Sequence, residues 1–184
     1  MVAESMKTAL LIASLATSIV GSAFAQSPAL PALPPDGFVT LQQIVSDFST
    51  APDAALQKYN GMRILVYGRV GQLAQPSDAQ GDPLAVFMQL PNQTTPDVKA
   101  VFTAADVPTT NLSISDDDTQ VAVFHRDWEG TLSSEKSFLV EGENVGIRGT
   151  FDNFVAGDVV LKNSSKLGTA SLMKKLAEHG IPTE

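Results

Sequence analysis

The stretch Tyr59–Leu73, read as Tyr-Asn-Gly-Met-Arg-Ile-Leu-Val-Tyr-Gly-Arg-Val-Gly-Gln-Leu, decides the fold of this chain. The pair Asn60-Gly61 predicts the end of a helix, and one long strand follows it. Two sets of side chains alternate along this strand, one on each face: Ile64, Val66 and Val70, and Leu65, Tyr67 and Arg69. Such alternation is typical of a strand with one face in a core. Gly68 predicts a bend or bulge, and a long bent strand is what a small barrel needs to close.

The residues before this strand predict two short helices, or one helix broken near Ser49. Thr40 and Gln43 resemble a capping box, and Pro52 marks a second helical start. Apolar residues follow at helical spacing: Leu41, Ile44, Val45 and Phe48, then Ala55, Leu56 and Tyr59. We expect this apolar stripe to close one end of the barrel.

Short alternating segments separated by turn residues continue to the end of the chain. They predict strands at Leu84–Leu90, Val98–Phe102, Gln120–His125, Val145–Phe151 and Asp158–Asn163. Thr103–Asp118 is expected to be a long irregular connection, and Thr169 is expected to cap a final helix. The predicted fold is therefore mainly β, a small closed five-stranded OB-type barrel with short N-terminal helices and a C-terminal helix.

Three runs resemble the bacterial tRNA_anti-like OB-fold family. Tyr59–Val70 is similar to its Y-x-G-k-x-v-x-V-x-G-x-V run, Val140–Thr150 to its l-x-x-G-d-x-V-x-v-x-G run, and Asp158–Asn163 to its closing v-x-L-x-n strand. The resemblance covers roughly Thr40–Asn163 in pattern. It implies an OB barrel, often in exported bacterial proteins, without a settled activity. Members often carry a cysteine after the closing strand, where this chain has Ser164.

Composition excludes several classes of protein. The 184 residues, 43% of them hydrophobic and 17% charged, describe one globular domain. The net charge of -8 disfavours sequence-independent nucleic-acid binding, because an acidic surface repels polyanions. The chain has no cysteine, which rules out disulfides, thiolate zinc sites, thiol catalysis and lipid attachment at a cysteine.

The amino terminus predicts export. Lys7 precedes an apolar run from Ala9 to Val20, and Ala23-Phe24-Ala25 forms a signal-peptidase pattern. The run is too short to span the membrane comfortably. We therefore expect a cleaved signal peptide at 1–25, a Pro-rich linker at 26–37 and a single OB-fold-like domain at 38–184. This organisation predicts a periplasmic or secreted protein with no membrane anchor after cleavage.

The sequence offers little chemistry for catalysis or for metal binding. Asp116-Asp117-Asp118 lacks the alternating spacing of a calcium loop, and His125 and His179 have no His partner at ligand spacing. His179 is explained by the dipole at the end of the last helix. His125 beside Asp127 is a local neighbour pair, and no nucleophile elbow or phosphate loop is present. We expect no catalytic residue, no metal site and no cofactor.

An OB barrel binds ligands on its second and third strands and on the flanking loops. The side chains there that can stack or hydrogen-bond are Phe87, Gln89, Lys99 and Phe102, with Arg126 and Trp128 expected on a rim loop. The alternative is that Phe87 and Phe102 belong to the barrel core. A contiguous exposed patch at Phe87, Phe102 and Trp128 would favour binding.

The preferred hypothesis is an exported, non-catalytic binding module for a protein, peptide or glycan. A periplasmic hydrolase or metal-dependent enzyme that uses His125 with Asp127, or the Asp116–Asp118 run, remains an alternative. Single-stranded nucleic-acid binding is a weaker one, because the cations are scattered along the chain.

Overall fold

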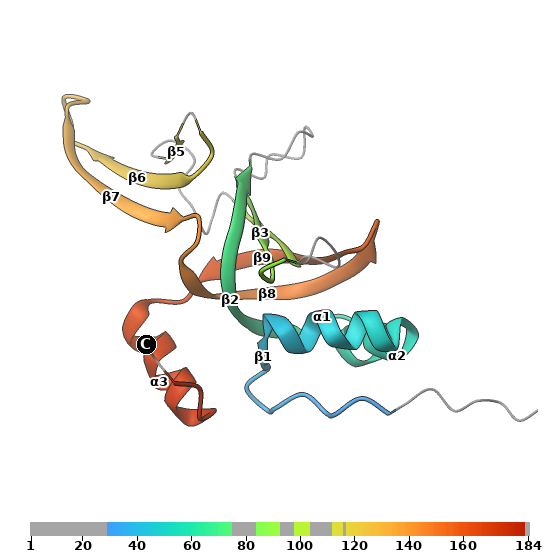
Figure 1. Ribbon diagram of the computed structural model, residues 1–184. Helices are drawn as coiled ribbons and strands as arrows, with labels where there is room; N and C mark the ends of the chain where they lie inside the picture. Colours follow the sequence, from blue (N-terminus) through green and yellow to red (C-terminus); the bar gives the residue numbers. More distant parts are fainter. Residues whose placement is uncertain (1–28, 75–83, 93–97, 104–111, 116, 183–184) are drawn as a thin grey trace, which may run out of the picture.

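The computed structural model describes residues 29–74, 84–92, 98–103, 112–115 and 117–182 (Figure 1). In chain order the elements are β1 Phe38–Thr40, α1 Leu41–Thr50, α2 Pro52–Tyr59, β2 Arg63–Ala74, β3 Leu84–Met88, β4 Val98–Phe102, β5 Leu112–Ile114, β6 Gln120–Arg126, β7 Leu132–Val140, β8 Asn144–Val155, β9 Asp158–Lys166 and α3 Thr169–Glu178. None of the described helices is long and apolar enough to cross a membrane. The predicted signal peptide lies outside the described residues.

Five strands close into a barrel in the order β2-β3-β4-β9-β8, and β8 returns to pair with β2. All pairs are antiparallel except β4–β9, which is parallel. The first strand, β2, pairs with β8 along Arg63–Arg69 and with β3 from Val70 onward. One long strand shared between two partners is what closes the sheet, and the prediction of a five-stranded OB-type barrel is confirmed.

Both faces of β2 are covered, each by a different part of the protein. Ile64, Val66 and Val70 lie inside the barrel in the main core. On the opposite face, Leu65 is fully buried against Leu172 and other residues of α3. The alternation predicted from the sequence is therefore correct, and the C-terminal helix covers the face that was expected to be more open.

The two strand glycines act differently from one another. A Cβ on Gly68 would lie 2.6 Å from Cβ of Leu41, so Gly68 allows α1 to approach the sheet. The register irregularity of β2 falls later, between Val70 and Gln72, so the bend predicted at Gly68 is displaced. At Gly149 the register against β9 does shift, and a Cβ there would lie 2.8 Å from Oγ of Ser164. Gly71 is thus the extra residue of the β2 irregularity, whereas at Gly149 the extra residue lies in the partner strand β9.

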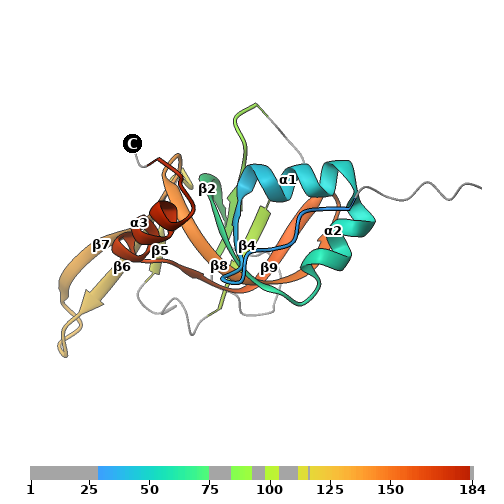
Figure 2. The ribbon, with the colours of Figure 1, turned by 90° about the horizontal axis from the view of Figure 1, so that it is seen from below.

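The two N-terminal helices close one end of the barrel, as predicted (Figure 2). Thr40 caps α1 by accepting a hydrogen bond from the backbone N of Gln43 at 3.1 Å. Phe48 of α1 stacks on Tyr59 of α2 and on Phe154 of β8, at centroid distances of 5.7 and 4.7 Å. The third helix begins one residue earlier than expected, because its N-cap is Gly168 and not Thr169.

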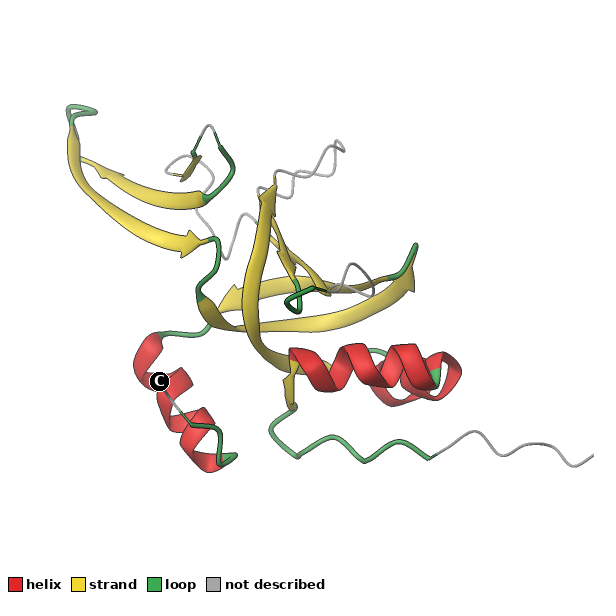
Figure 3. Cartoon of the chain, in the orientation of Figure 1, coloured by secondary structure: helices red, strands yellow, loops and turns green. Residues whose placement is uncertain are grey.

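An inserted sheet, β5-β6-β7, lies between β4 and β8 in the chain and projects from the barrel (Figures 1 and 3). The sequence predicted β6 and placed Arg126 and Trp128 on a rim loop, but it did not predict β7, which begins at Leu132. The run Leu132–Ser137 is wholly exposed and lacks apolar alternation, which is why its pattern did not predict a strand.

The described part of the predicted Pro-rich linker makes contacts with the domain. Leu30 and Leu33 are half-buried and pack against the main core. The short strand β1, which the sequence did not predict, pairs in parallel with Leu65–Tyr67 of β2. The end of the Pro-rich segment therefore lies against the domain.

Candidate functional site

Two of the predicted strand-face residues meet on the outside of the barrel. Phe87 of β3 and Lys99 of β4 are direct cross-strand partners, and both are half-buried. The Lys99 ammonium lies 5.6 Å from the centre of the Phe87 ring, within the range of a cation–π contact. Gln89 lies just beyond β3 and lines a separate groove. The described contact therefore joins one aromatic ring to one ammonium group.

Phe102, by contrast, lies in the core. Its side chain is fully buried and meets Phe138 edge to face, with ring centroids 5.9 Å apart. Phe138 is the extra residue of an irregularity in the β6–β7 register, and its carbonyl accepts a hydrogen bond from Lys166 of β9. The alternative interpretation, in which Phe102 belongs to the core, is therefore correct. The exposed patch of Phe87, Phe102 and Trp128 does not form.

These contacts define a joint between the barrel and the inserted sheet. Besides Phe138, Lys166 contacts the carboxylate of Glu143 at 2.9 Å. The same carboxylate oxygen accepts a hydrogen bond from the backbone N of Val140 at 2.9 Å. The aromatic pair with Phe102 of β4 and the two contacts of Lys166 of β9 thus fix the base of β7 to the barrel. The inserted sheet is held in a definite direction.

The tip of the inserted sheet carries the other two predicted residues, and it is a rigid turn. The Asp127 carboxylate accepts hydrogen bonds from the backbone N of Glu129 at 3.0 Å and of Thr131 at 2.8 Å. The Arg126 guanidinium donates to the carbonyl of Gly130 at 2.9 Å. Trp128 lies between these contacts with 91% of its surface exposed. The turn therefore presents an indole ring to solvent on an ordered support.

The candidate catalytic pair, His125 and Asp127, lies at the end of β6 and in this same turn. Asp127 is engaged with backbone groups, and His125 is exposed. Asp117 binds the hydroxyls of Ser115 and Thr119, which lowers the pKa of its carboxyl. Asp116 lies outside the described residues. Among those that are described, no three His, Asp or Glu side chains gather in a way that would hold a metal ion.

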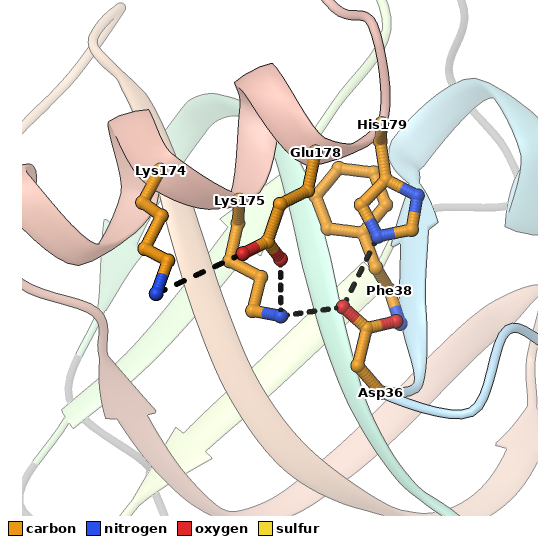
Figure 4. Close-up of polar contacts among 6 residues, drawn as sticks. All are labelled: Asp36, Phe38, Lys174, Lys175, Glu178 and His179. Atoms are coloured by element: carbon orange, nitrogen blue, oxygen red, sulfur yellow. Dashed lines mark hydrogen bonds and ion pairs between the residues drawn. The ribbon is translucent and has the colours of Figure 1, made fainter.

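A cluster that the sequence reading did not find joins the two ends of the domain (Figure 4). We call it the terminal clasp; its residues are Asp36, Phe38, Lys175, Glu178 and His179. Asp36 Oδ2 contacts Lys175 Nζ at 2.8 Å and His179 Nε2 at 3.1 Å, and the His179 ring stacks on Phe38 at 4.2 Å. The hydrogen bond from Lys175 holds the pKa of Asp36 well below its usual range. His179 thus has a specific partner beyond the helix dipole.

The clasp borders a cavity of about 350 Å³. Pro31–Pro34 form one wall, and Phe38, Lys58 and His179 contribute to the others. Lys58 is already engaged, because its ammonium contacts the buried carboxylate of Asp47 at 2.6 Å. This cavity is therefore bounded by structural contacts of the N-terminal segment.

Asp47 is a second site that the sequence reading missed. It is 2% exposed and accepts hydrogen bonds from Gln43, Lys58 and Tyr59 at 2.6, 2.6 and 2.7 Å. Burial and the neighbouring carboxylate raise the pKa of Tyr59 above its usual value. Because every donor has a partner, this network fixes α1 against α2. It is structural and offers no open face to a substrate.

Strand order and the inserted sheet together define the class of protein: an OB-type barrel that carries a projecting sheet between its third and fourth strands. No family model matches the chain, and no curated protein matches it. A solved structure from Klebsiella pneumoniae subsp. pneumoniae MGH 78578, described as a "putative nucleic acid-binding lipoprotein", is 18% identical. The match covers 71% of this chain and 91% of that chain, with a TM-score of 0.47. A likeness of this size transfers neither nucleic-acid binding nor lipid attachment to the present chain.

Proposed function

We propose that this protein is an exported, non-catalytic binding module whose inserted sheet holds an extended segment of another protein. The observation that carries the proposal is Trp128, 91% exposed on a turn that its neighbours hold rigid. Exposed tryptophans are unusual on free surfaces, and they are enriched among the residues that dominate protein interfaces. Burying such a ring under a partner gives roughly 4 kcal/mol before the costs of association.

The strand beside the tryptophan offers the second half of the contact. β7 is the last strand of the inserted sheet, and no strand of the described chain pairs with its outer edge. Its residues Leu132–Ser137 are exposed on both faces. An unpaired edge of this kind is a template for adding a strand from another chain.

Charge favours a different chain over a second copy of this one. Glu135 and Lys136 lie in the middle of the exposed part of β7. A two-fold antiparallel pairing centred on either residue would set Glu against Glu or Lys against Lys. Like charges directly opposite destabilise a sheet. The edge is therefore protected against self-pairing at its centre and remains open to a segment of complementary sequence.

Export is part of the proposal, and the sequence pattern of residues 1–25 supports it. Amino-terminal sequencing of the protein recovered from its own host tests it directly. We expect the mature chain to begin at Gln26. A chain recovered from the cytoplasm with Met1 or Met6 at its start would contradict export without affecting the contact surface.

Selection of extended peptides from a random display library against the purified domain tests the binding function. We expect enriched peptides to lose at least ~10-fold in affinity on Trp128→Ala, and to keep their affinity on the matched surface change Met173→Ala, since Met173 is exposed on α3. Ser134→Pro and Glu135→Pro test the contribution of the β7 edge separately from that of the Trp128 turn. Consecutive backbone N–H groups point to opposite edges of a strand, so one of the two variants removes an N–H from the outer edge of β7 alone.

The proposal fails if no peptide is enriched, or if the enriched peptides bind Trp128→Ala as well as the parent. If a glycan binds at Trp128, the ligand of the module is a carbohydrate and the proposed protein partner is wrong. Binding of single-stranded oligonucleotide that weakens steeply with salt would support the nucleic-acid alternative instead.

A further inference from the structure

A polar groove crosses the outside of the barrel beside β2, apart from the tip of the inserted sheet. Two adjoining cavities of about 430 and 220 Å³ form it, and they share Arg69 and the run Gln89–Pro91 that follows β3. Leu41 and Tyr67 help to line the larger cavity, and Glu141 lines the smaller one. The groove thus has an apolar half and a polar half, with a guanidinium between them.

Arg69 is a cation without a partner in the described part of the chain. No hydrogen bond or ion pair joins its side chain to any residue that the structure describes, although the protein carries an excess of acidic groups. Its guanidinium lies close over the turn at Gly142, where a Cβ would come within 3.2 Å of Nη2. The turn therefore orients the group. An oriented, unpaired guanidinium is suited to bidentate binding of a carboxylate.

Glu141 places an opposite charge on the same cavity. Its carboxylate also lacks a partner among the described residues, and it forms no ion pair with Arg69, although both line the 220 Å³ cavity. Two opposite charges that face one cavity without meeting fit a ligand that carries both signs. A polyanion would meet the Glu141 carboxylate as well as the guanidinium, which disfavours a nucleic acid here.

The larger cavity adds a requirement for an apolar group. Leu41, Leu90 and Pro91 lie on its walls with the ring of Tyr67. We propose that the groove binds short zwitterionic peptides with an apolar C-terminal residue. The free carboxylate lies on Arg69, the apolar side chain in the larger cavity, and the free ammonium by Glu141. This site is separate from the contact surface of β7 and Trp128, so either can fail without the other.

Titration calorimetry with the dipeptide Gly-Leu tests the site. We expect saturable one-site binding to the purified domain. Two blocked forms of the same dipeptide report on the two ends. N-acetyl-Gly-Leu lacks the ammonium and Gly-Leu-amide lacks the carboxylate, and each is expected to bind about 10-fold more weakly, because each loses one charge-assisted contact.

Two variants assign each end of the dipeptide to its residue. Arg69→Gln removes the preference for a free carboxylate and keeps the preference for a free ammonium, whereas Glu141→Gln does the reverse. Arg63→Gln is the matched control, since Arg63 is an exposed cation of β2 that does not line either cavity. All three side chains are exposed, so the melting temperatures are expected to stay equal.

Three results would overturn the proposal: no saturable binding of Gly-Leu, equal binding of Gly-Leu by the parent and by Arg69→Gln, or tighter binding of inorganic phosphate than of the dipeptide. Loss of peptide selection at Trp128 would leave this test unaffected, because the dipeptide does not reach the inserted sheet.

Discussion

Strands β7 and β8 are separated by only three residues of sequence but lie in different sheets, and the difference between them is instructive. In β8, Val145, Ile147 and Phe151 are buried in the barrel. In β7, Leu139 alone is buried, and the six residues from Leu132 to Ser137 are exposed. The barrel therefore holds the apolar core that stabilises the fold. The inserted sheet contributes surface, and its outer half has little core of its own.

The largest expected effect tests where the stability lies. Leu161→Ala in β9 removes a fully buried side chain from the main core, and we expect the free energy of unfolding to fall by about 3 kcal/mol. Leu132→Ala in β7 is the matched change, because Leu132 is 48% exposed, and we expect it to stay within about 0.5 kcal/mol. Urea unfolding measures both. Similar losses would show that the inserted sheet shares the stability of the barrel.

A buried carboxylate beside the barrel is expected to matter more than an exposed one in the inserted sheet. Asp47→Asn leaves one carbonyl to face three donors and leaves Lys58 without a counter-charge. We expect a loss of roughly 2–3 kcal/mol in the free energy of unfolding. Asp117→Asn is the control; its side chain is exposed and keeps one acceptor for its turn, so thermal unfolding should barely change. A stable Asp47→Asn variant would refute the structural role of the network.

A change at the joint between the barrel and the inserted sheet is expected to have a smaller effect on stability, and to act on the inserted sheet. Phe138→Ala removes the edge-to-face contact with Phe102, which is worth about 1 kcal/mol beyond burial. We expect faster amide hydrogen exchange in β6 and β7 and unchanged exchange in β2 and β8. Exchange that quickens equally in all four strands would mean that the two regions open together.

The smallest effect concerns pH and the terminal clasp. The pKa of Asp36 is lowered in the folded protein relative to its ordinary value of 3.8, so its contribution is present above about pH 4 and is lost as the pH falls further. The pKa of Lys175 is raised, so its contribution is lost only in strong base. We expect Asp36→Asn to cost less than about 1 kcal/mol at pH 7.

Thermal unfolding from pH 7 to pH 2 checks this expectation. Below about pH 4 the parent should lose its higher melting temperature relative to Asp36→Asn. A difference in melting temperature that stays constant to pH 2 would contradict the assignment. The inserted sheet provides the contrast: the pKa of Asp117 is also lowered, so Asp117→Asn is expected to change the pH dependence in the same direction, but by less, because this side chain is fully exposed.

The sequence predicted the elements whose pattern arises from packing. The alternation of Ile64, Val66 and Val70 placed β2 correctly, and the spacing of Leu41, Ile44 and Phe48 placed the helices at one end of the barrel. The inserted strand β7 escaped prediction because Ser133-Ser134-Glu135-Lys136-Ser137 has no apolar alternation.

The sites were harder to predict than the fold, for a physical reason. Phe102 was a candidate ligand residue because its ring lies on the third predicted strand and can stack, but an edge-to-face contact with Phe138, 36 positions later, keeps it buried. Asp36 and Asp47 gain their partners from distant elements, and no local spacing encodes such contacts. Whether Phe87, Gln89, Lys99, Arg126 and Trp128 bind a ligand stays a prediction.

The terminal clasp has a consequence for the kinetics of the protein. Lys175 reaches Asp36 across 139 positions of sequence, so nearly the whole domain lies within the loop that this contact closes. Contacts of such separation form after the more local pairing of β8 with β9 and of β2 with its neighbours. A change in the clasp should therefore hasten unfolding and leave the refolding rate almost untouched.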